Sequence, residues 1–492
     1  MRVLLLYPDC PDTFWSFKHA LKFIRKNAGA PPLGLLTVAA MLPPEWEVRL
    51  IDLGVQGVSD EDLSWADMAF VSAMIIQRDS AYHCIERCKR AGLRVVAGGP
   101  LFAAEYDRFP EVDHFVLNEA ELTLPPFLAD LAAGEPQRIY TTVEFPDIRQ
   151  SPVPRWELAD LRHYATANIQ FSRGCPFSCD FCNITALFGH RPRTKTAAQV
   201  IAELDRLYAL GWRHNVFFVD DNFIGNKQIL KTDILPAIIK WRAGKTGMPF
   251  CTEVSINLAD DAELLRLMVD AGFGAVFVGL ETPSEAGLSE CSKTQNRHRD
   301  LLDSVKRLQR AGLQVQGGFI VGFDSDTPKI FQQQVDFIQL SGITTAMVGL
   351  LQAPYGTRLY ERMKREGRLS SELTGDNGDG STNLVPLMGL DALREGYRWL
   401  LDQIYSPQFY YARARTFLRE YQAPKASMGL ELDYLIAFFR SVYELGMRGS
   451  ERAQYWALLF WTLGRRPKLF PLAVTLAISG YHFRLVAESR MW

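Results

Sequence analysis

Short hydrophobic runs alternate with amphipathic stretches along the first 145 residues. The pattern predicts strands at 2–7, 47–52, 68–73, 93–97 and 114–117, and helices at 33–42 and 80–91. Alternating strands and helices with short connections are typical of a parallel sheet that carries helices on both faces. We therefore expect an α/β fold that opens with a doubly wound, Rossmann-like domain over residues 1–145.

A second, longer alternation follows an irregular, proline-containing linker at 146–166. It predicts strands at 168–171, 215–219, 250–254, 275–280, 314–321 and 344–351, with helices at 197–210, 228–243, 260–271, 298–311 and 328–341. Six units of this size predict a partial, TIM-like (β/α)6 barrel over residues 167–365. In such barrels the chemistry lies at the carboxyl ends of the strands.

The pattern changes again in the last part of the chain, predicted as a mainly helical domain over 366–492. A Gly-, Asp- and Asn-rich loop at 375–381 lies near its start, and its apolar segments 455–463 and 469–483 flank a basic turn at 465–468. Two interpretations are open. The segments are packed helices that cap the barrel, or the cationic turn sits on an anionic membrane and receives a lipid.

Composition narrows the function classes. Lys and Arg total 54 against 56 Asp and Glu, a net charge of −2, which argues against a protein held to nucleic acid by bulk electrostatics. The amino terminus does not resemble a signal peptide, and segment 469–483 is shorter than the roughly 20 residues that span a bilayer. We expect a cytoplasmic protein, with membrane association limited to the carboxy-terminal domain.

Three of the eight cysteines fall in one loop. Cys175, Cys179 and Cys182 follow the first barrel strand with the spacing C-x3-C-x2-C. Thiolates this close can ligate one iron-sulfur cluster, and a four-iron cluster would then keep one iron open for a non-protein ligand. A structural zinc site completed by His190, or three cysteines with only a packing role, are the alternatives.

This loop strongly resembles that of the radical S-adenosylmethionine (SAM) superfamily, down to the aromatic Phe181 before the last cysteine. The resemblance implies that the three cysteines hold a 4Fe-4S cluster, that SAM chelates the open iron, and that reductive cleavage of SAM yields a 5′-deoxyadenosyl radical. It also implies SAM contacts at strand ends. These candidates are Asp220, Asp221, Asn222, Glu253, Ser255, Glu281, Gly318 and Gly322.

The amino-terminal domain resembles the cobalamin-binding domain of the cobalamin-dependent radical SAM class. The candidate cofactor contacts are Gly34, Ser72, Gly98, Gly99 and Glu119. The chain lacks an Asp-x-His-x-x-Gly motif, so the resemblance implies cobalamin with no histidine on cobalt. The alternative is a degenerate Rossmann-like domain that binds nothing.

The stretch from 353 to 360, and then 381–386, resembles the branch that includes the hopanoid C-2 methylases. These resemblances imply an enzyme that methylates an unactivated carbon of a lipid or secondary metabolite. It would take electrons from a reductant such as flavodoxin or ferredoxin. Two rivals stay open: a radical SAM enzyme that cyclises, oxidises or rearranges its substrate without methyl transfer, and a non-catalytic iron-sulfur or cobalamin carrier.

Overall fold

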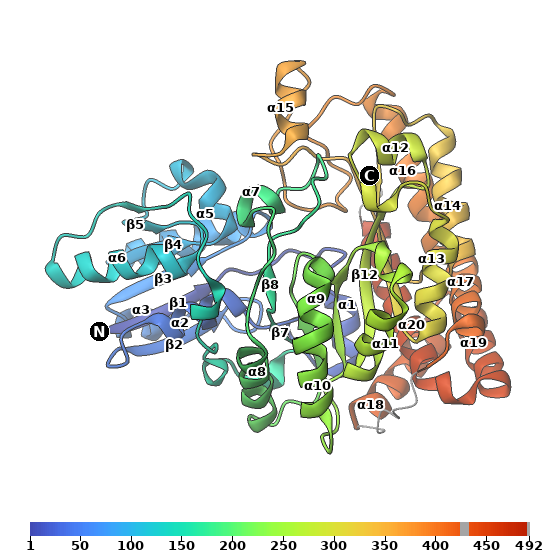
Figure 1. Ribbon diagram of the computed structural model, residues 1–492, viewed down its shortest axis with the longest axis horizontal. Helices are drawn as coiled ribbons and strands as arrows, with labels where there is room; N and C mark the ends of the chain where they lie inside the picture. Colours follow the sequence, from blue (N-terminus) through green and yellow to red (C-terminus); the bar gives the residue numbers. More distant parts are fainter. Residues whose placement is uncertain (424–431, 490–492) are drawn as a thin grey trace.

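The structure is a computed structural model that describes residues 1–423 and 432–489. The amino-terminal sheet, the barrel and a layer of carboxy-terminal helices lie side by side along the long axis (Figure 1). The first sheet is parallel, with the strand order β2-β1-β3-β4-β5-β6. Its strands are β1 (Arg2–Tyr7), β2 (Glu47–Asp52), β3 (Met68–Ser72), β4 (Arg94–Gly98), β5 (His114–Val116) and β6 (Ile139–Tyr140).

Helices cover both faces of this sheet. Leu4 and Leu6 of β1 belong to one hydrophobic core with Ile85, whereas Val3 and Leu5 belong to a second core on the opposite face. The predicted doubly wound fold is therefore confirmed. The helices are α2 (Leu33–Met41), α3 (Asp60–Trp65), α4 (Arg78–Arg90), α5 (Pro100–Glu105) and α6 (Ala120–Ala133).

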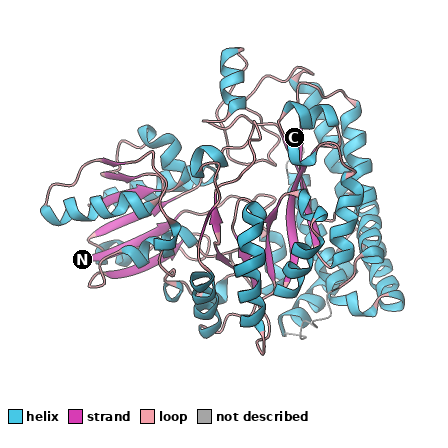
Figure 2. Ribbon diagram, viewed as in Figure 1, coloured by secondary structure: helices cyan, strands magenta, loops and turns pink. Residues whose placement is uncertain are grey.

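The partial barrel is also confirmed. Its parallel strands run in the order β14-β13-β12-β11-β10-β7, so the barrel stays open between β14 and β7. The strands are β7 (Thr166–Ile169), β10 (Asn215–Phe218), β11 (Phe250–Val254), β12 (Phe273–Glu281), β13 (Gln314–Val321) and β14 (Ala346–Leu350). The covering helices are α8 (Ala197–Ala209), α10 (Leu235–Arg242), α11 (Ala262–Ala271), α13 (Leu301–Ala311) and α14 (Lys329–Ser341), with the short α12 (Glu285–Glu290) at the strand ends (Figure 2).

The predicted helix at 228–243 is interrupted. Residues Lys227–Ile229 form α9, a π-helical turn covers Leu230–Ile234, and α10 begins at Leu235 with Pro236 in its first turn. A proline has no N–H to donate into the preceding turn, so an uninterrupted α-helical ladder cannot pass through Pro236.

The barrel wall alternates in burial. On β11, Phe250, Thr252 and Val254 are buried under the helices, whereas Cys251 and Glu253 between them are half-buried. Successive side chains of a strand point to opposite faces, so the half-buried set lies on the inner face. The inner-face side chains of β11 are therefore only partly covered by the rest of the protein.

The segment between β1 and α2, which includes α1 (Lys18–Leu21), reaches across to the other domains. The Phe14 ring stacks on Phe483 with centroids 4.4 Å apart. The Trp15 ring meets Phe277 of β12 edge-on at 5.2 Å. The first domain thus contributes an aromatic side chain to the inner wall of the barrel.

The last part of the described chain is mainly helical, as predicted. Its helices are α15 (Arg358–Arg365), α16 (Leu390–Tyr405), α17 (Pro407–Glu420), α18 (Leu432–Ser441), α19 (Arg452–Arg465) and α20 (Phe470–Ser489). The predicted domain end at 492 lies outside the described residues. The predicted linker holds three 3₁₀ turns and the fully buried Trp156, so it packs against the core.

One helical stretch, Pro467–Ser489, is long and apolar enough to cross a membrane, but 56% of its most apolar window is buried inside the protein. Ala473, Ala477 and Phe483 belong to the main core. For segment 469–483 the structure therefore favours the interpretation as a packed helix.

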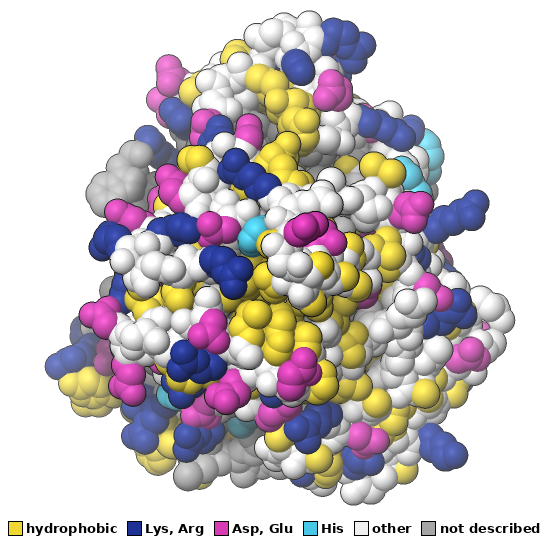
Figure 3. All heavy atoms as spheres, turned by 90° about the vertical axis from the view of Figure 1, so that its left-hand side faces the viewer, with side chains coloured by type: hydrophobic (Ala, Val, Ile, Leu, Met, Phe, Trp, Pro, Cys, Tyr) yellow, Lys and Arg dark blue, Asp and Glu magenta, His cyan; other side chains and the backbone are white. Residues whose placement is uncertain are grey.

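At the opposite end of the molecule, acidic and basic side chains are interspersed around a central group of hydrophobic ones (Figure 3).

Candidate cluster and cofactor site

The three cysteines lie in a loop that leaves the carboxyl end of β7. The loop is framed by the antiparallel pair β8 (Ser172–Arg173) and β9 (Arg193–Thr194), with α7 (Ile184–Phe188) between them. Gly174 has φ +95°, and a Cβ there would lie 2.9 Å from the Gly189 carbonyl oxygen. Only glycine fits this position, which directly precedes Cys175.

The donor set suits an iron-sulfur cluster. All three thiols are half-buried, and burial raises the pKa of Cys182 to about 12 and raises the pKa of Cys175. The buried ammonium of Lys293 opposes both shifts, since its charge favours the thiolates. Three thiols close to one buried cation match the ligands of an iron-sulfur cluster, for which soft thiolates are preferred.

Two carboxylates at the end of β10 fasten this loop. Asp220 accepts hydrogen bonds from the Phe171 backbone N–H (3.1 Å) and from the N–H and hydroxyl of Ser172, and Asp221 accepts one from the Gly174 N–H at 3.0 Å. Burial raises the pKa of Asp220 to about 7 and that of Asp221 to about 6. These hydrogen bonds hold the backbone that presents the cysteines, and the expected contact of both carboxylates with SAM stays a prediction.

Asn222, which follows β10, and Ser255, which follows β11, are hydrogen-bonded to each other. The Asn222 amide donates to the Ser255 hydroxyl at 3.2 Å and lies 4.0 Å from the Cys175 sulfur, and the Ser255 N–H donates back to the amide oxygen at 3.2 Å. Glu253 lies beside them on the inner wall. Burial, with the charges of Asp221 and Asp220, raises its pKa to about 8.

Glu281 ends β12 with φ +64° and pairs with Lys293, whose Nζ lies 2.6 Å from Glu281 Oε1. Nothing in the sequence marks Lys293, because it stands in a loop without a motif. Its Nζ lies 5.9 Å from the centroid of the Phe181 ring, and its positive charge favours the thiolate forms of Cys179 and Cys182. A second residue that sequence reasoning missed is Gln295, whose Nε2 lies 3.7 Å from the Cys179 sulfur.

The structure explains why glycine stands at the two predicted positions in β13 and the loop after it. A Cβ on Gly318 would lie 2.7 Å from Cζ of Phe277, so this glycine leaves room for the ring that meets Trp15. Gly322 has φ +105°, and its N–H donates to Asp326 at 2.9 Å.

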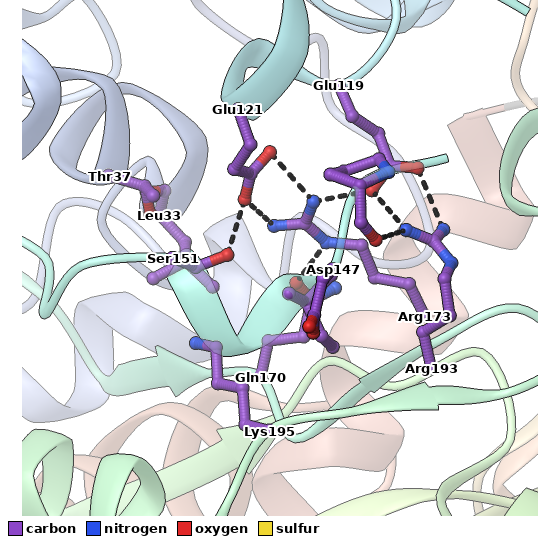
Figure 4. A network of polar contacts seen from close by, with 12 residues as sticks. Leu33, Thr37, Glu119, Glu121, Asp147, Ser151, Gln170, Arg173, Arg193 and Lys195 are labelled. Carbon is purple, nitrogen blue, oxygen red and sulfur yellow. Dashed lines mark hydrogen bonds and ion pairs between the residues drawn. The ribbon is translucent and has the colours of Figure 1, made fainter. Parts of the chain in front are cut away.

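A network of buried charges joins the two α/β domains (Figure 4). Arg173, two residues before Cys175, contacts Glu119 at 2.6 Å and Glu121 at 2.8 Å, both at the start of α6. Arg193 of β9 contacts Glu119 at 2.7 Å. Burial would raise the pKa of Glu121, but Arg173 outweighs it and brings the pKa to about 2. The carboxylate of Glu119, predicted to contact cobalamin, is committed to these two arginines.

The other predicted cobalamin contacts lie at or near the carboxyl edge of the first sheet, where Ser72 ends β3 and Gly98 ends β4. A Cβ on Gly98 would lie 2.7 Å from the Val116 carbonyl oxygen, and one on Gly99, at φ +93°, would lie 2.7 Å from the Ser72 hydroxyl. Both glycines are therefore required by packing. Gly34 is exposed, and a Cβ there would meet no atom of the described residues within 4 Å, so packing does not require glycine at this position.

A half-open cavity of about 190 Å³ adjoins the cluster loop. The thiol-bearing residues Cys179 and Cys182 form part of its wall. The other lining residues are Ser178, Thr185, Ala186, His190, Gly356, Thr357 and Arg358.

Comparison with known proteins bears on this arrangement. The Radical SAM superfamily matches residues 169–338, which include all three cysteines, and a domain of unknown function (DUF4070) matches 357–491. An uncharacterised methyltransferase of Synechocystis, sll1242, is 39% identical over 98% of this chain and 91% of its own length. The hopanoid C-2 methylase of Rhodopseudomonas palustris is 34% identical over 92% of this chain and 88% of its own. The chain belongs to the family of radical SAM methyltransferases that includes this hopanoid C-2 methylase.

Two solved structures share the fold of this radical SAM methyltransferase. The cobalamin-dependent S-adenosylmethionine radical enzyme OxsB aligns with a TM-score of 0.63 at 16% identity, over 95% of this chain and 79% of that one. The radical S-adenosylmethionine methyltransferase TsrM of Kitasatospora setae aligns with a TM-score of 0.59 at 16% identity, over 93% and 98%.

Proposed function

We propose that this enzyme methylates an unactivated carbon of an apolar, lipid-like substrate with a 4Fe-4S cluster, SAM and cobalamin. When bound, these cofactors supply the radical that abstracts hydrogen and the methyl group that replaces it. The observation that carries the proposal is the position of the three thiols. They stand at the carboxyl end of the barrel strands, in a loop whose Arg173 and Arg193 form ion pairs with a domain of cobalamin-binding fold.

In this proposal Cys175, Cys179 and Cys182 hold the cluster, and Asp220 and Asp221 keep their loop in place through backbone hydrogen bonds. Holding the reacting groups in fixed geometry is the main contribution a protein makes to such chemistry. Glu253, on the inner wall and without a hydrogen-bond partner among the described residues, is available to a polar group of SAM.

The inner wall also offers an apolar surface. The Trp15 and Phe277 rings meet there, and Trp15 is 41% exposed. Aromatic faces of this kind bind hydrocarbon surface, which supports an apolar substrate. The relative named hopanoid C-2 methylase supports a lipid in particular.

Electrons must reach the cluster from outside, and the cavity beside Cys179 and Cys182 supplies a short route. Arg358, 64% exposed at its side chain, stands at the edge of this cavity. We include in the proposal an acidic reductant, such as a flavodoxin or ferredoxin, that approaches there.

The test is anaerobic reconstitution with iron, sulfide and hydroxocobalamin, followed by gel filtration and metal analysis. We expect about four irons and one cobalt per chain. Incubation with SAM, reductant and candidate lipids should yield methylated product, S-adenosylhomocysteine and 5′-deoxyadenosine. Deoxyadenosine without S-adenosylhomocysteine would indicate radical chemistry without methyl transfer and overturn the methylation part. Iron without cobalt would overturn the role of the first domain.

A further inference from the structure

Hydrophobic side chains recur every four residues along α18 and the π-helical turn Val442–Arg448 that continues it. Leu435, Phe439, Tyr443 and Met447 are 45%, 67%, 44% and 63% exposed. Residues at this spacing share one side of a helix. Single exposed apolar residues are ordinary, but a row of them on one side forms a continuous apolar surface.

Helix α19 extends this surface. Phe460 is 65% exposed and Leu463 is 54% exposed. The Phe460 ring stacks on Trp456 with centroids 5.5 Å apart, and Trp456 Nε1 donates to the Gly446 carbonyl at 3.0 Å, next to Met447. We call the set Leu435, Phe439, Tyr443, Met447, Phe460 and Leu463 the docking face.

The docking face has a basic border. Residues 432–468, from the start of α18, contain six basic side chains and three acidic ones, a local charge of +3 in a chain whose net charge is −2. Glu451, one of the three acids, is buried and pairs with Arg484 at 2.6 Å. The Arg448 guanidinium lies 4.5 Å from the centroid of the Tyr443 ring, within the face itself. The basic residues are Arg440, Arg448, Arg452, Arg465, Arg466 and Lys468.

We propose that the docking face binds the surface of a bilayer that contains anionic lipid. The apolar side chains would enter the headgroup region while the basic border contacts lipid phosphates. A second copy of this chain fits less well, because pairing two docking faces would bring like-charged borders together. The binding does not depend on the reaction and can be measured without cofactors turning over.

The position of the face gives it a role. Helix α18 packs against the 3₁₀ turn Lys22–Ile24, and Arg440 donates a hydrogen bond to the Lys22 carbonyl. That turn belongs to the same segment as Trp15, which lies on the inner wall of the barrel. A bilayer on the docking face therefore adjoins the segment that reaches the barrel interior from the first domain.

The test is sedimentation of the full-length protein with vesicles of phosphatidylcholine alone or with about one third phosphatidylglycerol. We expect binding to the anionic vesicles that weakens as salt rises. The double variant Phe439→Ser/Phe460→Ser should bind at least about tenfold more weakly, and so should Arg465→Glu/Lys468→Glu. Thermal unfolding checks that the variants fold.

Leu387→Ser serves as the matched control, since Leu387 is also 67% exposed but lies outside the docking face, and its vesicle binding should equal that of the wild type. Undiminished binding by the Phe439→Ser/Phe460→Ser variant would overturn the proposal. So would a dimer, seen by light scattering, that the same two substitutions dissociate, because the occupant would then be a second copy. Loss of methylation with vesicle binding retained would bear on the proposed function alone.

Discussion

The two α/β domains consist of the same strand–helix repeat, yet they offer ligands different surfaces. In the first sheet Val3, Leu4, Leu5 and Leu6 are all fully buried, because helices cover both faces. In the barrel the sheet curves, its helices stay outside, and the inner face of β11 remains half-buried. A flat covered sheet leaves only its edge for ligands, whereas a curved one also exposes a wall of side chains.

The largest expected effect contrasts the cysteines of the two domains. Cys182→Ala should lower bound iron and reduce SAM cleavage by more than about a thousandfold, because a cluster thiolate is lost. Cys88→Ala, at a fully buried cysteine of the first domain, should keep both iron and cleavage. Iron analysis and deoxyadenosine assays check this. Iron retained by the Cys182 variant would contradict the ligand assignment.

The second-largest expected effect concerns the ion pairs between the two domains. Arg173→Met should cost about 3–5 kcal/mol of unfolding free energy, since it leaves two buried carboxylates poorly paired. Adding Glu121→Gln should restore part of the loss. The low pKa of Glu121 means that its contribution is present above its ordinary pKa near 4.5 and is lost as pH falls toward 2.

Urea unfolding checks both expectations, and the ratio of deoxyadenosine to methylated product checks positioning. Should Arg173→Met leave that ratio unchanged in a folded enzyme, the network would be structural only.

Glycine-to-alanine substitutions test how easily the packing of each domain adjusts to an added methyl group. Gly98→Ala brings a Cβ to 2.7 Å from a backbone carbonyl in the first sheet, and we expect a loss of about 2–3 kcal/mol. Gly318→Ala meets the Phe277 ring at the same distance, but this side chain is only half-buried and its ring can move more easily than a backbone carbonyl. We expect about 1 kcal/mol there, relieved by Phe277→Leu. Equal losses, measured by chemical unfolding, would mean that the barrel interior is as rigid as the flat sheet.

The last expected effect concerns pH. Burial raises the pKa of Glu253 to about 8, so the folded state holds this proton more strongly than the unfolded state. Stability from this group therefore falls as pH rises from about 4.5 through 8. Over that pH range the unfolding free energy of Glu253→Gln should fall by about 1–3 kcal/mol less than that of the wild type. Unfolding at several pH values measures it, with the exposed Glu86→Gln as control; parallel curves for Glu253→Gln and the wild type would contradict the expectation.

Patterning alone predicted the longer strands, although not the two-residue strands β6, β8 and β9, and it also marked the cysteine loop. The predicted strand 314–321 coincides with β13, and strand 2–7 with β1, because the hydrophobic pattern that marks a strand is contained in a few neighbouring residues. The spacing of Cys175, Cys179 and Cys182 likewise marked the loop that we propose holds the cluster, since a loop ligand set is a local feature.

The tertiary structure decided which polar side chains meet. Asp220 and Glu119 stood out in the sequence as cofactor contacts, but their partners, Ser172 and Arg173, come from other elements or another domain. Lys293 had no signal at all. A buried charge must find its partner wherever the chain brings one, and a contact across 54 residues, as between Glu119 and Arg173, is set by the packing of the two domains.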